Sequence, residues 1–341
     1  MGILFLGDFF YSYDYIAQDI LELSSYIRRN NYSVILNLEG PIAQDLSLTI
    51  NKRGEHLSQS ITVTDVLNYL NVKGVILSNN HSFDFSADGI INTMRLLDEH
   101  GIQYTGLVNA DGVSQQPITL LDNNIIYHIY SATDPFEESF CSSSEMSCLE
   151  IKDLPITNTA QCNKDIRLAF LHTGFEYNTL PTIRTIKECR KLIDCGFDGV
   201  ICSHPHIIQP YEKYNDKYIF YSLGNFYFSE YRQEFSQKRI AGKAPHYCDI
   251  GHGVIYENGK YADGIEIRYI PSENKSCITD NFQAAKLPAS CFSWKYKHMY
   301  YTNRNNHNFL LTGNKLTDDL KMRILNNLYR FYRTLKGIIK R

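Results

Sequence analysis

Side chains that commonly bind divalent metals follow several short apolar runs of the sequence. Asp8 comes after the run Ile3–Leu6, and Glu39 comes after Val34–Leu38. The later runs are followed by amides and imidazoles: Asn80 and His81 after Gly74–Leu77, His172 after Arg167–Leu171, and His204 and His206 after Gly199–Cys202. Oxygen and imidazole donors without thiolates suit Mn, Fe or Zn. The pattern therefore predicts a site for divalent metal ions.

The apolar runs are typical of strands in an α/β fold, because amphipathic helical patterns alternate with them. Besides the runs above, we predict strands at Ile125–Tyr130 and Tyr218–Tyr221, and helices at Tyr15–Arg28, Ser86–Glu99 and Leu180–Cys195. Gly101 and Gly196 each follow a helical pattern, where a C-terminal glycine is favoured. In open α/β sheets, ligand groups gather beyond the carboxyl ends of the strands. The polar side chains are therefore expected to meet at one rim.

A carboxylate at such a rim can bridge two metal ions about 3.5–4 Å apart, and such a pair clamps both oxygens of a phosphoryl transfer. The segment His204-Pro205-His206 supplies two imidazoles one residue apart. Alternation along an extended segment would place both rings on one face, and Pro205 favours extended geometry at His204. The combination indicates a two-metal site more strongly than any single motif does.

The remaining chain is less regular. Residues 136–163 are rich in Ser, Cys, Glu and Asn, and we predict an inserted surface loop there. The segment Gly253–Ile270 alternates apolar and polar residues around Asn258-Gly259, which predicts a β-hairpin. A last helix is predicted at Lys315–Arg341.

Composition narrows the classes of protein. The 341 residues carry a net charge of −3, so no global basic field points to a nucleic-acid partner. No signal-peptide pattern opens the chain, and no apolar run reaches the roughly 18 residues of a membrane span. The nine cysteines include no Cys-x-x-Cys pair. Together these features favour a cytoplasmic protein with reduced thiols.

The motif segments resemble a known family, the bacterial capsule-synthesis family named for the poly-γ-glutamate synthesis protein CapA. The resemblance extends in order over residues 2–270. It rests on the segments Asn37-Leu-Glu-Gly-Pro41, Ser78-Asn-Asn-His81-Ser-Phe-Asp84, His172-Thr-Gly-Phe-Glu176-Tyr, Gly196-Phe-Asp-Gly-Val-Ile-Cys-Ser-His-Pro-His206-Ile-Ile-Gln209-Pro and Tyr221-Ser-Leu-Gly-Asn225-Phe. That family is similar to calcineurin-like metallophosphoesterases. The resemblance therefore implies a four-layer α/β/β/α sandwich with a dinuclear metal centre.

The resemblance also implies a role for each site residue. Asp8 and His206 correspond to ligands of the first metal, Glu39 to the bridging carboxylate, and Asn80, His172 and His204 to ligands of the second metal. His81 corresponds to the general acid or oxyanion-stabilising histidine, Asp84 and Glu176 to groups that orient imidazoles, and Asn225 to a group that positions backbone or substrate. The expected cofactors are two divalent ions, with Mn, Fe or Zn favoured.

Two departures from the metallophosphoesterase pattern stand out. Those enzymes commonly carry Asp-x-His in the first motif, whereas Phe9 and Phe10 follow Asp8 here, so the first metal is expected to have fewer protein ligands. Family members also often carry Trp where this chain has Thr173. Lys52 and Arg53 lie in the predicted loop after Glu39. They either hold an anionic substrate or are a solvated pair in that loop.

The predicted last helix is basic and amphipathic. Its basic residues are Lys321, Arg323, Arg330, Arg333, Lys336, Lys340 and Arg341, and its apolar stripe is Leu320, Ile324, Leu328, Phe331, Leu335 and Ile338. Such a helix can contact an anionic membrane or a biosynthetic complex, or it can pack on the domain. The sequence thus divides into a catalytic domain at 1–270 and an extension at 271–341.

The function expected from these features is a phosphoesterase-type hydrolase in capsule or surface-polymer biosynthesis, with a metal-bridging hydroxide as nucleophile. Its substrate is expected to be an anionic small molecule or polymer. Two alternatives remain open. The same metals can serve transfer or cleavage of an amide or glutamyl-type bond, or the chain can be a non-catalytic accessory subunit of a polymer synthase or exporter.

Overall fold

A computed structural model describes residues 2–43, 45, 48–52, 56–134, 143–155, 165–229, 231–233, 240–242, 248–270, 275–280, 282–293 and 296. The chain forms two compact units, Met1–Cys291 and Phe292–Arg341. All the strands and helices discussed below belong to the first unit. The predicted last helix, Lys315–Arg341, and Arg53 lie outside the described residues.

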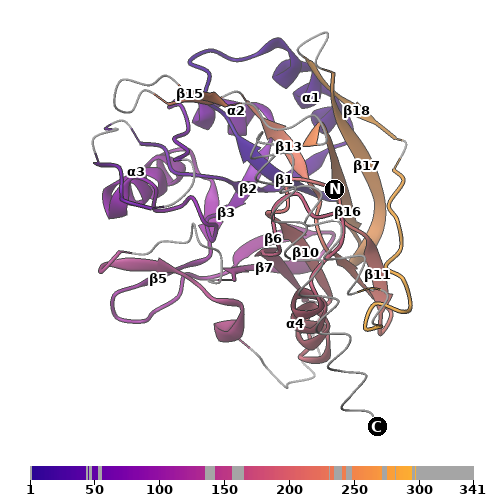
Figure 1. The fold of residues 1–341 in the computed structure, drawn as a ribbon. Helices are drawn as coiled ribbons and strands as arrows, with labels where there is room; N and C mark the ends of the chain where they lie inside the picture. The colour runs from indigo at the N-terminus through magenta and orange to yellow at the C-terminus, as the bar shows by residue number, and fades with distance from the viewer. Residues whose placement is uncertain are drawn as a thin grey trace, which may run out of the picture. The chain divides into compact units, whose positions relative to one another are not determined.

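The larger of two main sheets carries eight strands and contains the N-terminal strand (Figure 1). Its order is β18-β17-β16-β1-β2-β3-β4, and β13 also pairs with β1. The strands are β1 (Gly2–Phe10), β2 (Tyr32–Leu38), β3 (Val72–Ile76), β4 (Gln103–Thr105), β13 (Asn225–Phe228), β16 (Ile250–Glu257), β17 (Lys260–Ile270) and β18 (Lys275–Thr279). Strands β1 to β4 run parallel, and β16 to β18 continue the sheet in antiparallel pairs.

The second sheet has six strands in the order β11-β12-β10-β9-β7-β6. They are β6 (Ile118–Asp122), β7 (Ile125–Thr133), β9 (Ile166–His172), β10 (Gly199–Ser203), β11 (Tyr211–Tyr214) and β12 (Lys217–Phe220). The four central strands are parallel, and the two edge strands pair antiparallel. The carboxyl ends of β9 and β10 therefore lie side by side at one edge of this sheet.

The two sheets face each other through an apolar core, and strand β1 shows how. Ile3 and Phe5 pack with side chains of the second sheet such as Phe170, whereas Leu4 and Leu6 belong to a separate cluster with helical residues such as Ile20. Alternate side chains of a strand point to opposite faces, so a strand covered on both sides is apolar throughout. This explains why the first run of the sequence lacks polar alternation.

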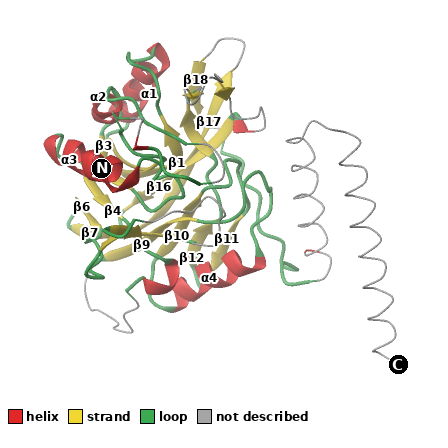
Figure 2. Ribbon diagram, turned by 60° about the vertical axis from the view of Figure 1, so that its left-hand side comes forward, coloured by secondary structure: helices red, strands yellow, loops and turns green. Residues whose placement is uncertain are grey.

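Helices cover the outer faces of both sheets (Figure 2). The helices α1 (Gln18–Arg29), α2 (Val63–Tyr69) and α3 (Ser86–Glu99) contact strands of the first sheet, and α4 (Ile183–Asp194) contacts β10 and β12 of the second. The chain thus has a mixed α/β fold with several sheets. Among the described residues, no helix has the length and apolar character needed to cross a membrane.

Local sequence signals placed most of these elements correctly. All the predicted strands are present, and α3 spans the predicted residues Ser86–Glu99. Gly101 (φ +66°) and Gly196 (φ +95°) follow α3 and α4 in the left-handed conformation that favours glycine. Asn258 (φ +50°) and Gly259 (φ +80°) join β16 to β17 in the conformation of a type I′ turn. These predictions are confirmed.

The predicted loop at 136–163 is wrong in part. Residues 135–142 and 156–164 lie outside the described part of the chain, but β8 (Met146–Cys148) pairs antiparallel with β5 (Leu107–Asn109). A short 3-10 helix, Ile151–Asp153, follows. Cys148 is buried in the core cluster beneath the first sheet. Leu149, Ile151 and Leu154 are buried as well, and the polar composition of the segment concealed these buried residues. A further two-stranded sheet pairs β14 (Tyr231–Gln233) with β15 (Ile240–Gly242).

Candidate metal centre

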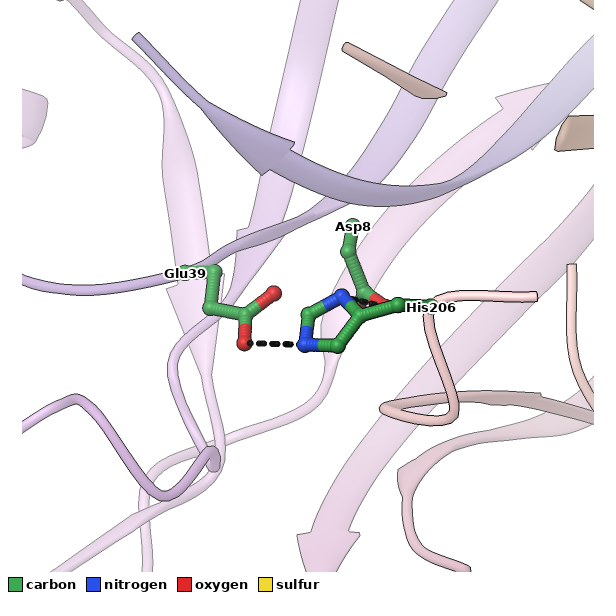
Figure 3. Close-up of side chains that lie close together, drawn as sticks. All are labelled: Asp8, Glu39 and His206. Atoms are coloured by element: carbon green, nitrogen blue, oxygen red, sulfur yellow. Dashed lines mark ion pairs between the residues drawn. The ribbon is translucent and has the colours of Figure 1, made fainter. Parts of the chain in front are cut away.

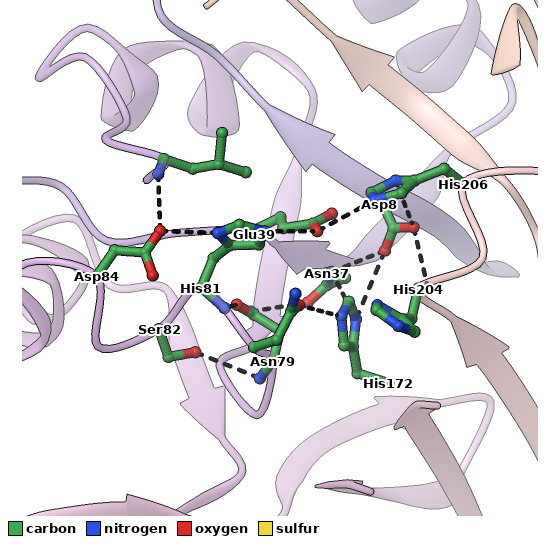
Figure 4. A network of polar contacts seen from close by, with 12 residues as sticks. Asp8, Asn37, Glu39, Asn79, His81, Ser82, Asp84, His172, His204 and His206 are labelled. Atoms are coloured by element: carbon green, nitrogen blue, oxygen red, sulfur yellow. Dashed lines mark hydrogen bonds and ion pairs between the residues drawn. The ribbon is translucent and has the colours of Figure 1, made fainter. Parts of the chain in front are cut away.

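The predicted metal ligands meet at the carboxyl ends of parallel strands from both sheets (Figure 4). The first sheet supplies Asp8 from β1, Glu39 directly after β2, and the turn after β3 that carries Asn80. The second sheet supplies His172 at the end of β9 and the turn after β10 that carries His204 and His206. All of these side chains are buried. The expectation of a shared rim is confirmed, and two sheets form it.

Asp8 lies within β1, which continues to Phe10, and not after the strand as the apolar run suggested. The register of β1 against β2 shifts between Leu6 and Asp8, and its register against β13 shifts between Asp8 and Phe9. Such irregularities bend a strand and redirect a side chain. The strand therefore presents Asp8 to the site without ending there.

Asp8, Glu39 and His206 form the tightest group of potential ligands (Figure 3). One ligand atom of each lies within 4.8 Å of the others. His206 Nδ1 is 3.5 Å from Asp8 Oδ2, and His206 Nε2 is 3.5 Å from Glu39 Oε1. Two carboxylates and an imidazole at this spacing can surround one divalent ion.

Glu39 is the least satisfied acidic group of the cluster. Its side chain is fully buried, and neither carboxylate oxygen accepts a hydrogen bond from the described part of the chain. Burial raises the pKa of Glu39 well above its usual value, and the neighbouring Asp8 raises it further. A buried carboxylate without donors is costly unless a cation lies beside it. The residues present thus fit a bound metal ion.

Asp8, by contrast, is held by donors from the chain. The Asn37 amide donates to Asp8 Oδ1 at 2.8 Å, and the His204 backbone N–H donates to Asp8 Oδ2 at 3.1 Å. These bonds fix the direction of the carboxylate. Groups that orient ligands in this way commonly change metal affinity when removed.

The imidazoles on the second sheet form a second group. His172 Nε2 lies 2.8 Å from Asn80 Oδ1, and its ring centroid is 4.6 Å from that of His204. His172 Nδ1 is 3.2 Å from the Asn37 amide nitrogen and 3.3 Å from Ser203 Oγ. Burial lowers the pKa of His172 well below its usual value, and His204 lowers it further. The ring is therefore neutral, the form in which histidine binds metals.

The expected extended geometry of His204-Pro205-His206 is wrong. The φ angles are +101° at His204 and +58° at His206, in the left-handed region. The proline bias toward extended backbone is outweighed by tertiary contacts, since the His204 N–H must reach Asp8. The segment is a strained turn that still brings both rings to the site, with centroids 6.2 Å apart.

His81 faces the cluster from the turn after β3. Its Nε2 is 4.0 Å from Glu39 Oε1, and its Nδ1 is 2.7 Å from Asp84 Oδ2. Lys52 forms an ion pair with Asp84, and its Nζ lies 3.2 Å from His81 Nδ1. Burial lowers the pKa of His81, and the Lys52 charge lowers it further. Asp84 thus orients an imidazole, as the sequence predicted.

Lys52 fits neither of its two expected roles, contact with an anionic substrate or a place in a solvated loop. Its side chain is only 1% exposed, and the ammonium group is engaged with Asp84. This arrangement favours a part in holding the His81 turn over direct contact with an anionic substrate. Arg53, its predicted partner in substrate binding, lies outside the described residues.

Asn225 and Glu176 complete the predicted set. Asn225 Oδ1 lies 2.9 Å from His206 Nδ1, so the amide positions a ligand ring. Glu176 is half-buried, and its charge adds to the factors that raise the pKa of Glu39. That Glu176 orients an imidazole stays a prediction.

An apolar wall lies where the metallophosphoesterase pattern would have its second histidine. Phe10 is buried, and its ring centroid is 5.2 Å from that of Phe228. Phe228 in turn meets His206 edge-on at 5.2 Å, and the Tyr177 ring lies 5.9 Å from His206. The expectation of fewer protein ligands beside Asp8 agrees with this wall.

Three supporting residues had no role in the sequence analysis: Asn37, Asn79 and Ser203. Asn37 connects Asp8 with His172, and the Asn79 amide donates to Asn37 Oδ1 at 3.1 Å. All three are fully or almost fully buried. Each of the three is a polar residue at or just after the end of an otherwise apolar run. Such positions were considered in the sequence only for side chains that bind metals directly.

Two curated proteins are similar to this chain over about two thirds of its length. PGA biosynthesis protein CapA of Bacillus subtilis (strain 168) is 27% identical over 223 residues, which cover 63% of this chain and 58% of that protein. Capsule biosynthesis protein CapA of Bacillus anthracis is 25% identical over 234 residues, which cover 64% of this chain and 55% of that protein. The chain therefore spans somewhat more than half the length of these curated relatives.

A solved structure of a hypothetical protein from Thermus thermophilus aligns with 82% of this chain and 99% of its own, at 11% identity and a TM-score of 0.44. The family model described as bacterial capsule synthesis protein PGA_cap matches residues 5–230. That match includes Asp8, Glu39, His172 and His206; it covers the second sheet and, in the first sheet, most of β1 together with β2, β3, β4 and β13. The chain belongs to the bacterial capsule synthesis PGA_cap family.

Proposed function

We propose that this chain is a metal-dependent hydrolase of the phosphoesterase type that acts in capsule or surface-polymer biosynthesis. The observation that carries the proposal is the fully buried Glu39 carboxylate, which accepts no hydrogen bond within the described chain and lies beside Asp8 and His206. An acid in that position is suited to a shared place between two cations.

The fold supports the same proposal. The two main sheets pack face to face, with α1 to α3 against one and α4 against the other. We assign this arrangement to the four-layer α/β/β/α sandwich of calcineurin-like metallophosphoesterases. In that arrangement the carboxyl ends of β1, β2, β9 and β10 form the rim that holds the ligands.

The ligands divide into two groups that share Glu39. Asp8, Glu39 and His206 would hold the first ion, and Glu39, Asn80, His172 and His204 would hold the second. Mn, Fe or Zn suits this donor set. When bound, such a pair neutralises charge on phosphoryl oxygens and lowers the pKa of water.

The chain's own residues then position the substrate and move a proton. His81 Nε2 faces the cluster at 4.0 Å from Glu39 Oε1, close enough to reach the leaving oxygen of a phosphoester bound there. Asp84 holds the opposite nitrogen, Nδ1, and is itself paired with Lys52. When both ring nitrogens carry protons, with Nδ1–H donated to Asp84, His81 gives its Nε2 proton to the leaving oxygen and remains a neutral imidazole.

The biological setting rests on the family and on the names of the relatives, which refer to capsule and PGA biosynthesis. Those names also favour a second candidate, cleavage or transfer of an amide or glutamyl-type bond at the same residues. Contact of the predicted last helix with a membrane or a biosynthetic complex remains a prediction outside the described residues.

Turnover of model substrates by the Mn-supplied full chain separates these candidates. We expect hydrolysis of p-nitrophenyl phosphate or bis-p-nitrophenyl phosphate that is lost in Glu39→Gln. Hydrolysis of γ-glutamyl-p-nitroanilide alone, lost in the same variant, would favour the second candidate. A metal-loaded protein that cleaves none of these compounds would contradict the phosphoesterase proposal and favour an accessory subunit.

A further inference from the structure

Tyr177 lies beside His206 in a backbone conformation that a bulky side chain rarely adopts. Its φ is +60°, its ring centroid is 5.9 Å from that of His206, and the planes are inclined by 31°. The residue is half-buried, so part of it remains open to solvent. Tyr177 is therefore a neighbour of a proposed metal ligand and is itself partly open to solvent.

The pattern of left-handed residues sets Tyr177 apart. Most non-glycine residues with positive φ among those described are small polar residues: Asn31, Asn71, Ser86, Asn123, Asn124, Asn215, Asp216 and Asn258. The exceptions are Tyr177, His204 and His206. Asn and Asp tolerate this conformation, whereas a bulky residue held there is strained. Strain of this kind gathers at functional sites, and here it coincides with the proposed ligands.

The loop that carries Tyr177 is fixed to the histidine turn. The Tyr177 N–H donates to the Pro205 carbonyl at 2.9 Å, and the Gln209 amide donates to the Asn178 carbonyl at 2.6 Å. Gly174, at φ +121°, packs so closely that a Cβ there would lie 3.1 Å from Pro205 Cγ. The Tyr177 ring is thus held at a set position relative to His206.

We infer that Tyr177 is a substrate-contacting residue that selects phosphoesters whose esterified group contains a ring, such as a sugar or an aryl group. This inference rests on the proposed function, since it takes the phosphoryl group to lie among the metal ligands. A phosphoester bound beside His206 would extend its esterified group away from the buried ligands, and the half-buried Tyr177 is the partly exposed aromatic residue next to His206. The flat aromatic face favours contact with another ring, which a small alkyl group cannot supply.

Binding of two non-hydrolysable probes tests this without turnover. Phenylphosphonate and methylphosphonate are titrated calorimetrically into the Mn-loaded full chain, and the ratio of their dissociation constants is compared among variants. We expect the wild type to favour phenylphosphonate and Tyr177→Gly to reduce that preference about three- to tenfold. Tyr177→Phe, which keeps the ring, should retain the preference. Glycine adopts positive φ readily, so Tyr177→Gly relieves strain and leaves the loop backbone intact.

Mn binding and thermal unfolding of both variants provide the structural readout: Mn affinity should match the wild type, and both variants should unfold in one cooperative transition. Tyr69→Ala serves as the matched control, because Tyr69 is 42% exposed at the end of α2, at the sheet edge opposite the site. An unchanged preference in Tyr177→Gly would overturn the role of Tyr177 and leave the proposed function standing. Failure of both phosphonates to bind the Mn-loaded wild type would overturn the proposed function and this inference with it.

Discussion

Two acidic side chains, Glu39 and Asp84, are both fully buried near the same histidine, yet their surroundings differ. Asp84 has an ion pair with Lys52, a hydrogen bond from the Leu57 N–H at 2.7 Å, and a contact with His81. Glu39 accepts no hydrogen bond from the described residues and faces a second acid, Asp8. One region of the site is complete within the chain, and the other lacks a positive charge.

The two environments indicate different uses of a buried acid, a structural one at Asp84 and a chemical one at Glu39. A buried carboxylate is tolerated when donors and a cation surround it, as they surround Asp84. Glu39 has no such hydrogen-bond donor or cation among the described residues. Unsatisfied buried groups of this kind are expected at functional sites. The difference supports the proposal that metal ions supply the missing charge at Glu39, whereas Lys52 pairs with Asp84 beside His81.

The largest expected effect comes from removing ligands around Glu39. We expect Glu39→Ala and His204→Ala to lose bound metal and at least about 10³-fold in turnover together, because the site acts as a unit. His128→Ala is the matched control, since His128 lies on β7 with 28% of its side chain exposed. Elemental analysis and phosphatase assays on the same samples check this. Retention of metal by His204→Ala would remove it from the ligand set.

A substitution of His81, which contacts Asp84, should lower the reaction rate without removing bound metal. We expect His81→Ala to keep its metal and to lose about 10²–10⁴-fold in rate, the usual contribution of a general acid. Metal content and kcat measured side by side test the assignment. If His81→Ala loses metal as completely as His204→Ala, His81 is a ligand and the proton-donor role is wrong.

Removing the cation that satisfies Asp84 should convert it into a second unsatisfied acid. We expect Lys52→Met to lower the free energy of unfolding by about 3–5 kcal/mol, because it leaves a buried charge unpaired. Adding Asp84→Asn to Lys52→Met should restore much of that loss. Denaturant unfolding of the two single variants and the double variant measures the coupling. Additive losses would show that the ion pair does not account for the stability of this region.

Asn37 tests whether side chains that orient the ligands also contribute to metal affinity on the Glu39 side of the site. Its amide donates to Asp8 and lies against His172, so Asn37→Ala should weaken metal binding about 10–100-fold while the fold persists. Calorimetric titration with Mn gives the affinity, and Asn92→Ala on α3, partly buried away from the cluster, is the control. Unchanged affinity would mean that backbone geometry alone orients Asp8.

The smallest effect is expected in the metal-free protein. The pKa of Glu39 is raised by folding, so the folded state keeps its proton to higher pH than the unfolded chain, in which the pKa has its usual value of 4.5. Stability should therefore fall as the pH rises from 4.5 through the raised pKa. Glu39→Gln should abolish that fall and be more stable above it by roughly 1–3 kcal/mol. His172, with its lowered pKa, produces the opposite slope in both proteins, and this slope cancels in the difference.

Parallel pH series of thermal unfolding in chelator compare wild type with Glu39→Gln. A difference that does not grow with pH would show that Glu39 finds a counter-charge within the chain, and the comparison with Asp84 would fail.

The fold was predictable where local signals agree with tertiary packing. The helix Ser86–Glu99 and the turn at Asn258-Gly259 follow directly from periodicity and turn chemistry. Strand β13 was not predicted. It has only four residues, and its pairing with β1 depends on a close approach of the two backbones at Gly224, which leaves no pattern in the sequence. The edge strand β18 was missed for a similar reason, since its stability comes from pairing with β17.

The site was predictable in composition but not in geometry. The residue types at the strand ends indicated which side chains meet, whereas the left-handed turn at His204 depends on an Asp8 contact far away in the sequence. For Lys52 the sequence left both a substrate contact and a solvated loop open, because its partner, Asp84, lies on a separate loop. Long-range pairing of charges leaves no periodic mark in a sequence, so these roles became visible only in the folded chain.

Metal binding by the purified full chain tests the central claim most directly. Calorimetric titration of chelator-treated protein with Mn, confirmed by elemental analysis, should give close to two ions per chain, or one tight and one weak site given the apolar wall at Phe10. Glu39→Gln should lose most of this binding. A wild-type protein that takes up no transition metal when Mn or Zn is supplied would contradict the account.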